Sequence, residues 1–401
     1  MIKRRILIIN NRVSYPLNDG GNLAVHAMIE GYKKAGWEVA VLAMNTTRHH
    51  VAESVLKNLY TDIHSFETVD VDNSIRPLPM LKNFLLTSEP HHVKRFQSAS
   101  FAQKLEKALR DFDPHVVQVE SIYLTGYVNL IREVCNAKVV LRLHNIENHI
   151  WQRFALEKKN LQQFYFNNLA KRVRHFEHSA WDKYDLLLPI TAKDANVVKR
   201  HVDQDKIYVV PYGIDTSKIH SCADEKWEGY HIGAMDWVPN SEAIKWFLNK
   251  VWPYVHNLAP DFKFYFAGRN MPSSFRHLHI PNVICAGEVP DANAFIADKK
   301  ILILPLRSGG GIRIKALEAM AAGKIVISTD QGMQGIDAVA GEHYIAANEP
   351  KEFAKAINWC RIYRKESQEI AENGAGLVRS KYDINLIMEG LVSKMNELLQ
   401  A

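Results

Sequence analysis

The sequence predicts an α/β protein made of two Rossmann-like domains, each built on a parallel sheet. Three observations support this class. Short apolar segments rich in β-branched residues alternate with helical segments in both halves, and such alternation produces parallel sheets covered by helices. The 401 residues, 47% of them hydrophobic, suffice for two cores. Between the halves, the segment Pro211-Tyr212-Gly213-Ile214-Asp215 brings proline and glycine close together, which is typical of a hinge.

These observations predict the domain boundaries. We expect an N-terminal domain over residues 1–210, a C-terminal domain over residues 211–380 and a closing helix over residues 381–401.

The first half opens with a continuous apolar run over residues 5–10, which predicts a buried strand. A loop broken by Asp19-Gly20-Gly21 follows, and then a helix over residues 22–35 and a strand over residues 37–44. Further strands are predicted over residues 62–71, 115–119, 138–143, 186–189 and 207–210. Further helices are predicted over residues 101–112, 122–134, 151–182 and 192–200.

The second half repeats this alternation. Strands are predicted over residues 230–234, 262–267, 283–286, 301–305 and 324–328. Helices are predicted over residues 241–251, 312–322, 351–363, 368–382 and 385–399. Residues 301–328 therefore form one unit of strand, glycine loop, helix and strand.

The glycine loop of this unit is suited to an anion. Its three consecutive glycines are Gly309, Gly310 and Gly311. Glycines let the backbone approach a ligand closely, and the following helix offers unpaired N–H groups and the positive end of its dipole. The basic residues of the same turn are Arg307, Arg313 and Lys315. A phosphate or diphosphate group is therefore the expected ligand.

Glu318 lies about two turns into the predicted helix, which is too far along to cap it. Alone, this residue fits a solvated charge on a helix. Beside the glycine loop, its carboxylate is placed to accept hydrogen bonds from sugar hydroxyls.

The stretch PLRSGGGIRIKALEAMAAGKIVIST and the trailing GMQGI resemble the donor-binding signature of the retaining glycosyltransferases of family 4. That family has the GT-B fold, in which two Rossmann-like domains face each other across a cleft and the closing helix crosses back onto the first domain. The resemblance implies that Glu318 holds the ribose of a nucleotide sugar. It also implies a donor site that includes the glycine loop, Ile312 and Lys315, with Val289 pairing with the nucleobase through its backbone.

Two departures from the family pattern concern the donor. The second glutamate usually found eight positions before Glu318 is replaced by Gly310, as in one branch of the family. The usual arginine after the glycine of the first C-terminal strand is absent, because Ala234 and Met235 follow Gly233. The diphosphate would then depend on the three basic residues of the glycine loop.

The N-terminal half supplies three further candidates. Gly20 and Gly21 lie in the loop after the first strand, at the sheet edge where ligands bind, and the resemblance implies that they face the donor. They also suit a turn that enters a helix. His144 follows the strand over residues 138–143, and the resemblance implies that it faces the transferred sugar. We assign His144 a hydrogen bond to a sugar hydroxyl rather than proton abstraction. The catalytic candidates are thus His144, Arg313 and Glu318.

Several classes of site are disfavoured. No G-x-G-x-x-G follows a strand, so a nicotinamide oxidoreductase ranks last. The four cysteines are far apart, which disfavours a structural zinc site. The family resemblance implies no essential metal, so we expect no metal and no cofactor besides the donor substrate. The adjacent His91 and His92 lack acidic or cysteine partners at ligand spacing. The sequence also lacks the patterns of nucleic-acid-binding modules.

Charge and hydropathy suggest partners and location. Residues 1–210 hold 29 Lys+Arg and 22 Asp+Glu, whereas residues 211–401 hold 21 and 22. This basic half suits an anionic membrane surface or a lipid-linked acceptor, although a scattered solvated surface explains it equally well. Residues 78–95, which mix apolar and basic groups, are one candidate for membrane contact. We expect a cytoplasmic protein that lies peripherally on the inner face of the membrane.

The sequence therefore predicts a retaining glycosyltransferase that moves a sugar from a nucleotide sugar to a glycan or lipid-linked acceptor in cell-surface polysaccharide or glycoconjugate synthesis. Two alternatives remain open: a sugar-nucleotide epimerase of the same fold, and a non-catalytic subunit that binds nucleotide sugars.

Overall fold

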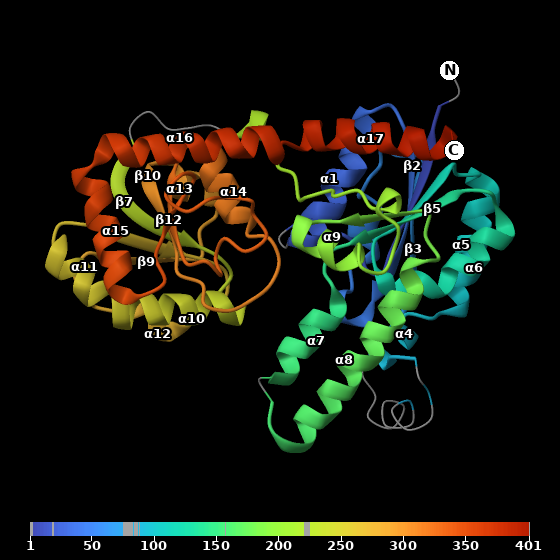
Figure 1. Cartoon of the computed structure of the whole chain (residues 1–401), viewed down its shortest axis with the longest axis horizontal. Helices are drawn as coiled ribbons and strands as arrows, with labels where there is room; N and C mark the ends of the chain where they lie inside the picture. Colours follow the sequence, from blue (N-terminus) through green and yellow to red (C-terminus); the bar gives the residue numbers. More distant parts are fainter. Residues whose placement is uncertain are drawn as a thin grey trace. The chain divides into compact units, whose positions relative to one another are not determined.

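A computed structural model describes residues 3–17, 20–74, 83, 87, 89–156, 158–219 and 225–400. The chain divides into two compact units, Met1–Gly213 with Ile387–Ala401, and Ile214–Leu386 (Figure 1). Part of the segment over residues 78–95, a candidate for membrane contact, lies outside the described residues.

The first unit is built on a parallel sheet with the strand order β3-β2-β1-β4-β5-β6 among the described residues. The strands are β1 (Arg5–Asn10), β2 (Glu38–Thr46), β3 (Ser65–Val71), β4 (Val116–Val119), β5 (Lys138–Leu143) and β6 (Leu186–Pro189). Its helices are α1 (Gly20–Lys34), α2 (Glu53–Leu56), α4 (His91–Lys94), α5 (Ala99–Phe112), α6 (Val128–Val134), α7 (Glu147–Leu156), α8 (Asn160–Trp181) and α9 (Ala192–Val198). Short 3₁₀ turns are η1 (Thr47–His49), η2 (Ile122–Tyr127) and η3 (Gln204–Lys206).

The second unit repeats the plan, with the strand order β12-β11-β10-β7-β8-β9 in the described part. The strands are β7 (Lys226–Ile232), β8 (Phe264–Ala267), β9 (Val283–Gly287), β10 (Lys299–Leu304), β11 (Ile325–Ser328) and β12 (Ile345–Ala346). Its helices and turns are η4 (Thr216–Lys218), α10 (Val238–Trp246), the π-turn η5 (Phe247–Val251), α11 (Trp252–Leu258), α12 (Ser273–Arg276), α13 (Ala292–Ala297), α14 (Ile314–Ala321), α15 (Pro350–Ile362) and α16 (Arg364–Lys381). Helix α17 (Ile384–Gln400) ends the chain.

Both sheets are buried by helices, which confirms the predicted class. In the first unit, Leu7 and Ile9 of β1 share a core cluster with Phe101 and Leu105 of α5. In the second, Ile301 and Ile303 of β10 share one with residues of α11 and α15. Strands buried on both faces need apolar residues at every position, which explains the continuous apolar runs in the sequence.

The final helix packs closely within the first unit. Residues Ile387–Ala401 belong to that unit. A Cβ placed on Gly31 of α1 would lie 2.4 Å from Cγ of Met388 in α17, so the glycine permits the close approach of the two helices.

Some predicted elements differ from the structure. Residues 207–210 form no strand, and only an isolated bridge joins Ile207 to Leu187. The single helix predicted over residues 151–182 is two helices, because Lys159 is extended and Asn160 has a φ of +53°. The helix predicted over residues 241–251 starts at Val238 and continues to Leu258. It passes through the π-turn η5, because Pro253 at the start of α11 lacks an N–H and disturbs the regular hydrogen bonds.

Candidate functional site

The glycine loop lies between β10 and α14, at the carboxyl edge of the second sheet. Gly309 and Gly311 have φ values of +96° and +79°, in the left-handed region that other residues rarely adopt. A Cβ on Gly309 would also lie 3.0 Å from the Trp237 ring. Gly310 is exposed, so the middle of the loop is open to a ligand.

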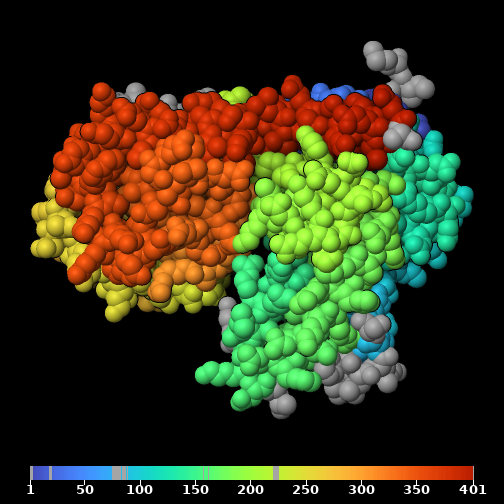
Figure 2. Space-filling model, in the orientation of Figure 1, coloured from blue at the N-terminus to red at the C-terminus, as the bar shows by residue number. Residues whose placement is uncertain are grey.

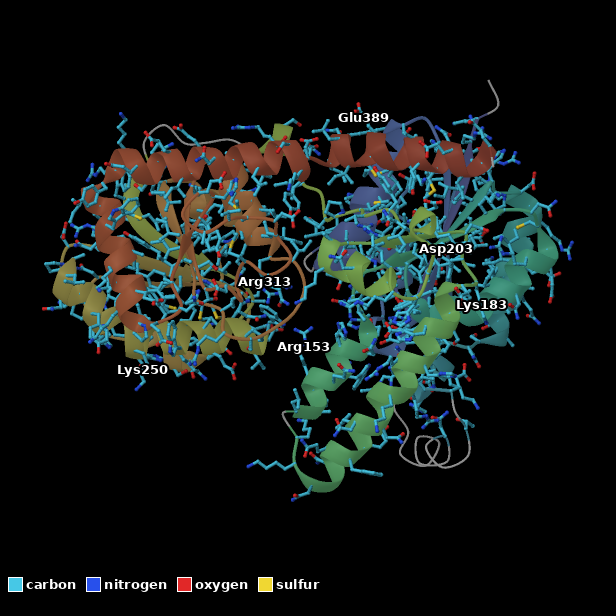
Figure 3. The ribbon with its side chains drawn as sticks, in the orientation of Figure 1. Arg153, Lys183, Asp203, Lys250, Arg313 and Glu389 are labelled. Atoms are coloured by element: carbon cyan, nitrogen blue, oxygen red, sulfur yellow. The ribbon has the colours of Figure 1, made fainter. Side chains whose placement is uncertain are left out.

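Arg313 stabilises this loop through hydrogen bonds to its carbonyl groups. The helix starts at Ile314, later than the predicted Ile312, and the buried Arg313 occupies the N-cap position. Its guanidinium donates to the carbonyl of Gly310 and, at 3.0 Å, to that of Gly311. It also lies 5.3 Å from the centre of the Trp237 ring (Figure 3 labels Arg313 beside the loop). Arg313 therefore shapes the loop as well as charging it.

Two residues hold Lys315 in place: His231 of β7 and Asn240 of α10. Nζ of Lys315 donates to Oδ1 of Asn240 at 3.0 Å and lies 3.5 Å from Nε2 of His231. Asn240 donates in turn to the carbonyl of Ala234 at 2.9 Å, and Nδ1 of His231 is 2.9 Å from the carbonyl of Ile303. Because a carbonyl only accepts, the ring proton of His231 sits on Nδ1, and Nε2 faces the amine as an acceptor.

Burial sets the protonation of this group. Burial, followed by the charge of Lys315, lowers the pKa of His231 to about 3, so the imidazole is neutral. Burial and the charge of Arg313 lower the pKa of Lys315 to about 7, against the opposing effect of Glu318. The amine can therefore gain or lose a proton near neutral pH.

Glu318 lies one turn after Lys315 on α14. Its side chain is exposed, and it forms no hydrogen bond with the residues that the structure describes. The protein around the carboxyl raises its pKa, and the charge of Lys315 opposes this rise. Water nevertheless reaches the carboxylate, because the side chain is exposed. The carboxylate is thus available to accept hydrogen bonds from a ligand.

The other candidates of the second unit lie at the same sheet edge. Arg307 is exposed, and its guanidinium lies 5.3 Å from the centre of the Trp246 ring. Val289 follows β9 and is half-buried. In the sheet, β7 and β8 separate β9 from β10, so Val289 is three strands away from the glycine loop.

In the first unit, His144 belongs to a chain of buried hydrogen bonds. Its Nε2 lies 2.8 Å from Oε2 of Glu120, whose other oxygen accepts from Gln118 at 2.5 Å. Gln118 accepts from the hydroxyl of Tyr32 at 2.6 Å. Gly20 and Gly21, the other candidates of this unit, are the first two residues of α1, and Gly20 is exposed.

Glu120 determines which nitrogen of His144 carries a proton. Burial alone would raise the pKa of Glu120, but the bonds from His144 and Gln118 and the charge of Arg142 together hold it below its ordinary value. A carboxylate can only accept, so Nε2 of His144 donates to it and leaves Nδ1 for a ligand.

Four of these residues were not predicted from the sequence: Glu120, His231, Trp237 and Asn240. The sequence held partial indications, because Glu120 directly follows an apolar strand and His231 interrupts one. Their partners are 24 to 84 residues away, at Glu120–His144 and His231–Lys315, and no local pattern reports such pairs.

The described residues contain no group of three or more His, Cys, Asp or Glu side chains arranged to hold a metal ion. They also contain no helix that is both long and apolar enough to cross a membrane. His92 packs its ring 4.1 Å from that of Trp151, and burial lowers its pKa to about 4.

Comparison with protein families matches both halves of the chain. The model described as glycosyltransferase family 4 matches residues 18–218, which is half of the chain. The model described as glycosyl transferases group 1 matches residues 229–361. A Klebsiella pneumoniae protein described as an uncharacterized 44.6 kDa protein in the cps region is 24% identical, over 96% of this chain and 98% of its own.

Solved structures share the fold. HepE of Anabaena in complex with UDP has a TM-score of 0.68 and 12% identity, over 98% of this chain and 100% of its own. Sucrose-phosphate synthase from Thermosynechococcus elongatus has a TM-score of 0.67 and 14% identity, over 99% and 100%. HepE was also solved with UDP-glucose, and that structure has a TM-score of 0.62 and 14% identity, over 98% and 99%.

Proposed function

Because this chain belongs to glycosyltransferase family 4 and has the GT-B fold, we propose that it transfers a sugar from a nucleotide sugar, with retention at the anomeric carbon. The acceptor is a glycan or a lipid-linked glycan of a cell-surface polysaccharide or glycoconjugate. The similarity to a Klebsiella pneumoniae protein of the cps region supports this pathway. The complexes of Anabaena HepE with UDP and UDP-glucose support a nucleotide sugar as the donor.

One observation carries the donor assignment: an open glycine loop is followed within one helix by a half-buried lysine amine and an exposed carboxylate. The loop and the start of α14 accept the diphosphate. Lys315 and Arg307 neutralise its charge, which grows on the leaving oxygen as the glycosidic bond breaks. Glu318 accepts hydrogen bonds from the ribose hydroxyls.

Lys315 and Arg307 neutralise the diphosphate in place of a divalent metal ion. Lys315 becomes fully charged beside a diphosphate, and Arg307 adds a guanidinium that can bind the phosphate oxygens. The reaction therefore proceeds without a divalent cation and without a cofactor other than the donor. His144 accepts one hydrogen bond from a hydroxyl of the transferred sugar, through the Nδ1 that Glu120 leaves available.

The proposed location follows from cysteine use. The three described cysteines, Cys135, Cys285 and Cys360, form no disulfide. Such usage suits a reducing compartment, so we place the protein in the cytoplasm, at the inner face of the membrane when its acceptor is lipid-linked.

A transfer assay with labelled nucleotide sugar tests the function. The wild-type chain is expected to release nucleotide diphosphate and label a polysaccharide-precursor acceptor, with or without EDTA. An epimerised sugar formed without acceptor would instead indicate an epimerase. Tight donor binding without release across a panel of acceptors would indicate a binding subunit.

A further inference from the structure

The helix pair α7 and α8 forms a hairpin that extends from the first unit (Figure 1; its green projection is visible in Figure 2). Its tip exposes three large apolar side chains. Leu156 is 76% exposed, Phe164 is 66% exposed and Phe154 is 36% exposed. Large apolar side chains normally stabilise a fold by being buried. Three of them exposed together at the end of one projection therefore indicate an interaction site.

The same tip is basic. Between residues 150 and 170 the sequence has Arg153, Lys158 and Lys159 but a single acidic residue, Glu157. None of the three basic side chains forms an ion pair within the described part of the chain. Nζ of Lys158 lies 4.4 Å from the centre of the Phe154 ring, so charge and aromatic surface adjoin (Figure 3 labels Arg153 on α7).

Hydrogen bonds to one buried glutamate hold the base of the hairpin. Buried Glu177 of α8 accepts from the backbone N–H groups of Glu147 at 2.7 Å and Asn148 at 2.9 Å, at the first turn of α7. It also accepts from Nδ2 of Asn148 at 2.7 Å. Midway along, the rings of Trp151 and Phe166 stack across the two helices with centroids 6.1 Å apart.

We propose that the tip of this hairpin, formed by Phe154, Leu156 and Phe164 with Arg153, Lys158 and Lys159, docks on an anionic phospholipid surface. Apolar and aromatic side chains enter the boundary between headgroups and acyl chains, while lysine and arginine contact the headgroup phosphates. This site goes beyond the proposed reaction, because neither donor binding nor transfer to a free glycan requires it.

Chemistry and shape favour a membrane over a protein partner. A stable protein interface buries more than about 1,000 Å² in total, and three apolar side chains at the end of a projecting hairpin offer little of that area. A bilayer accepts a projecting tip, because single side chains insert between lipids. The positive charge matches anionic headgroups, and each lysine near such a surface strengthens partitioning about fivefold.

Vesicle sedimentation of the full chain tests the proposal. Vesicles of phosphatidylcholine mixed with phosphatidylglycerol are expected to bind the protein, and vesicles of phosphatidylcholine alone are expected to bind it at least about tenfold more weakly. The double variant Leu156→Ser/Phe164→Ser should lower partitioning at least about tenfold. Lys158→Gln/Lys159→Gln should lower it by a similar factor and reduce its salt dependence.

Matched controls lie in the second unit. Ile362→Ser removes an apolar side chain that is 62% exposed, and Lys250→Gln removes an exposed lysine, and neither should change vesicle binding. UDP-induced thermal shifts should be unchanged in the hairpin variants, so a failure of docking is distinct from a failure of donor binding. Absence of binding to anionic vesicles, or an equal loss in the controls, overturns the proposal. So does a lipid-free dimer that Leu156→Ser/Phe164→Ser dissociates, since a second copy would then cover the tip.

Discussion

At the scale of single residues, the charge of the Lys315 amine depends on whether a diphosphate is bound beside it. Its pKa of about 7 in the free protein results from burial and from Arg313, opposed by Glu318, while neutral His231 adds no charge. A bound diphosphate raises this pKa, because the charged amine then has an anionic partner. The affinity for the diphosphate is therefore highest below the pKa of Lys315 in the free protein. It decreases as the pH rises through the pKa of Lys315 in the complex.

This linkage predicts that UDP binds more weakly at pH 9 than at pH 7.5, a range in which UDP itself stays ionised. Isothermal titration in two buffers with different ionisation heats should show proton uptake on binding at the higher pH. Lys315→Arg, whose charge does not titrate, should bind with a flatter pH profile. Wild-type affinity that is constant across this range, with no proton uptake, would contradict the linkage.

Glu120 carries a second prediction at this scale. Glu120→Gln leaves His144 without an anionic partner, and the tautomer with Nδ1 available loses its preference. We expect kcat to fall about tenfold or more while the KM for the donor changes little. In the His144→Asn background, Glu120→Gln should add little further loss, because the two residues act as one unit. Independent, additive losses in that double variant would show that Glu120 acts elsewhere.

Sequence patterns identified the residues whose role is local. Gly309 and Gly311 stand out because the chain itself needs φ values that glycine provides. Asn240 and Glu120 did not stand out, because each acts on a residue brought close only by the parallel sheet. The sequence also suggested a charged role for Arg313, whereas the structure adds its bonds to the carbonyls of Gly310 and Gly311 within the loop.

At the scale of the element, the glycine loop depends on space as well as conformation. Gly309→Ala places a Cβ at a φ of +96° and 3.0 Å from the Trp237 ring, which is tighter than ordinary contact. We expect it to cost about 1–3 kcal/mol of stability and to weaken UDP binding, as the loop and Arg313 shift. Chemical denaturation and titration of UDP measure the two effects.

Gly376→Ala provides the matched control for that change. Gly376 lies within α16, and a Cβ there meets no atom within 4 Å. The substitution should leave UDP affinity unchanged and stabilise the protein by up to about 1 kcal/mol, since alanine favours helix. Equal effects of the two substitutions would show that the glycine loop has no special geometry.

Elements were predicted well where periodicity is strong. The strands β1, β5 and β6 match their predicted residues, because continuous apolar runs are typical of buried parallel strands. The break between α7 and α8 was missed because it depends on the backbone of Lys159 and Asn160, and the start of α7 was missed because Glu177 holds it from 30 residues away. Helical periodicity continues through residues 151–182 and gives no sign of that contact.

At the scale of the whole molecule, two sheets of the same plan carry different chemistry. The edge of the second sheet gathers the glycine loop, Lys315 and Glu318, and the first unit holds the His144–Glu120 pair. The excess of positive charge lies in residues 1–210, which include the basic hairpin tip. Composition predicted this division of charge, but only the structure shows the exposed apolar side chains beside it.

The most direct test of the donor site is the thermal shift of the full chain with UDP-, GDP- and ADP-sugars. A ligand that binds only the folded state raises Tm. We predict that nucleotide sugars of one base raise the Tm of the wild type and of Gly376→Ala, and that Glu318→Ala loses most of this rise while keeping its ligand-free Tm. No rise with any nucleotide sugar, or an equal rise in Glu318→Ala, would contradict a nucleotide-sugar site at the glycine loop.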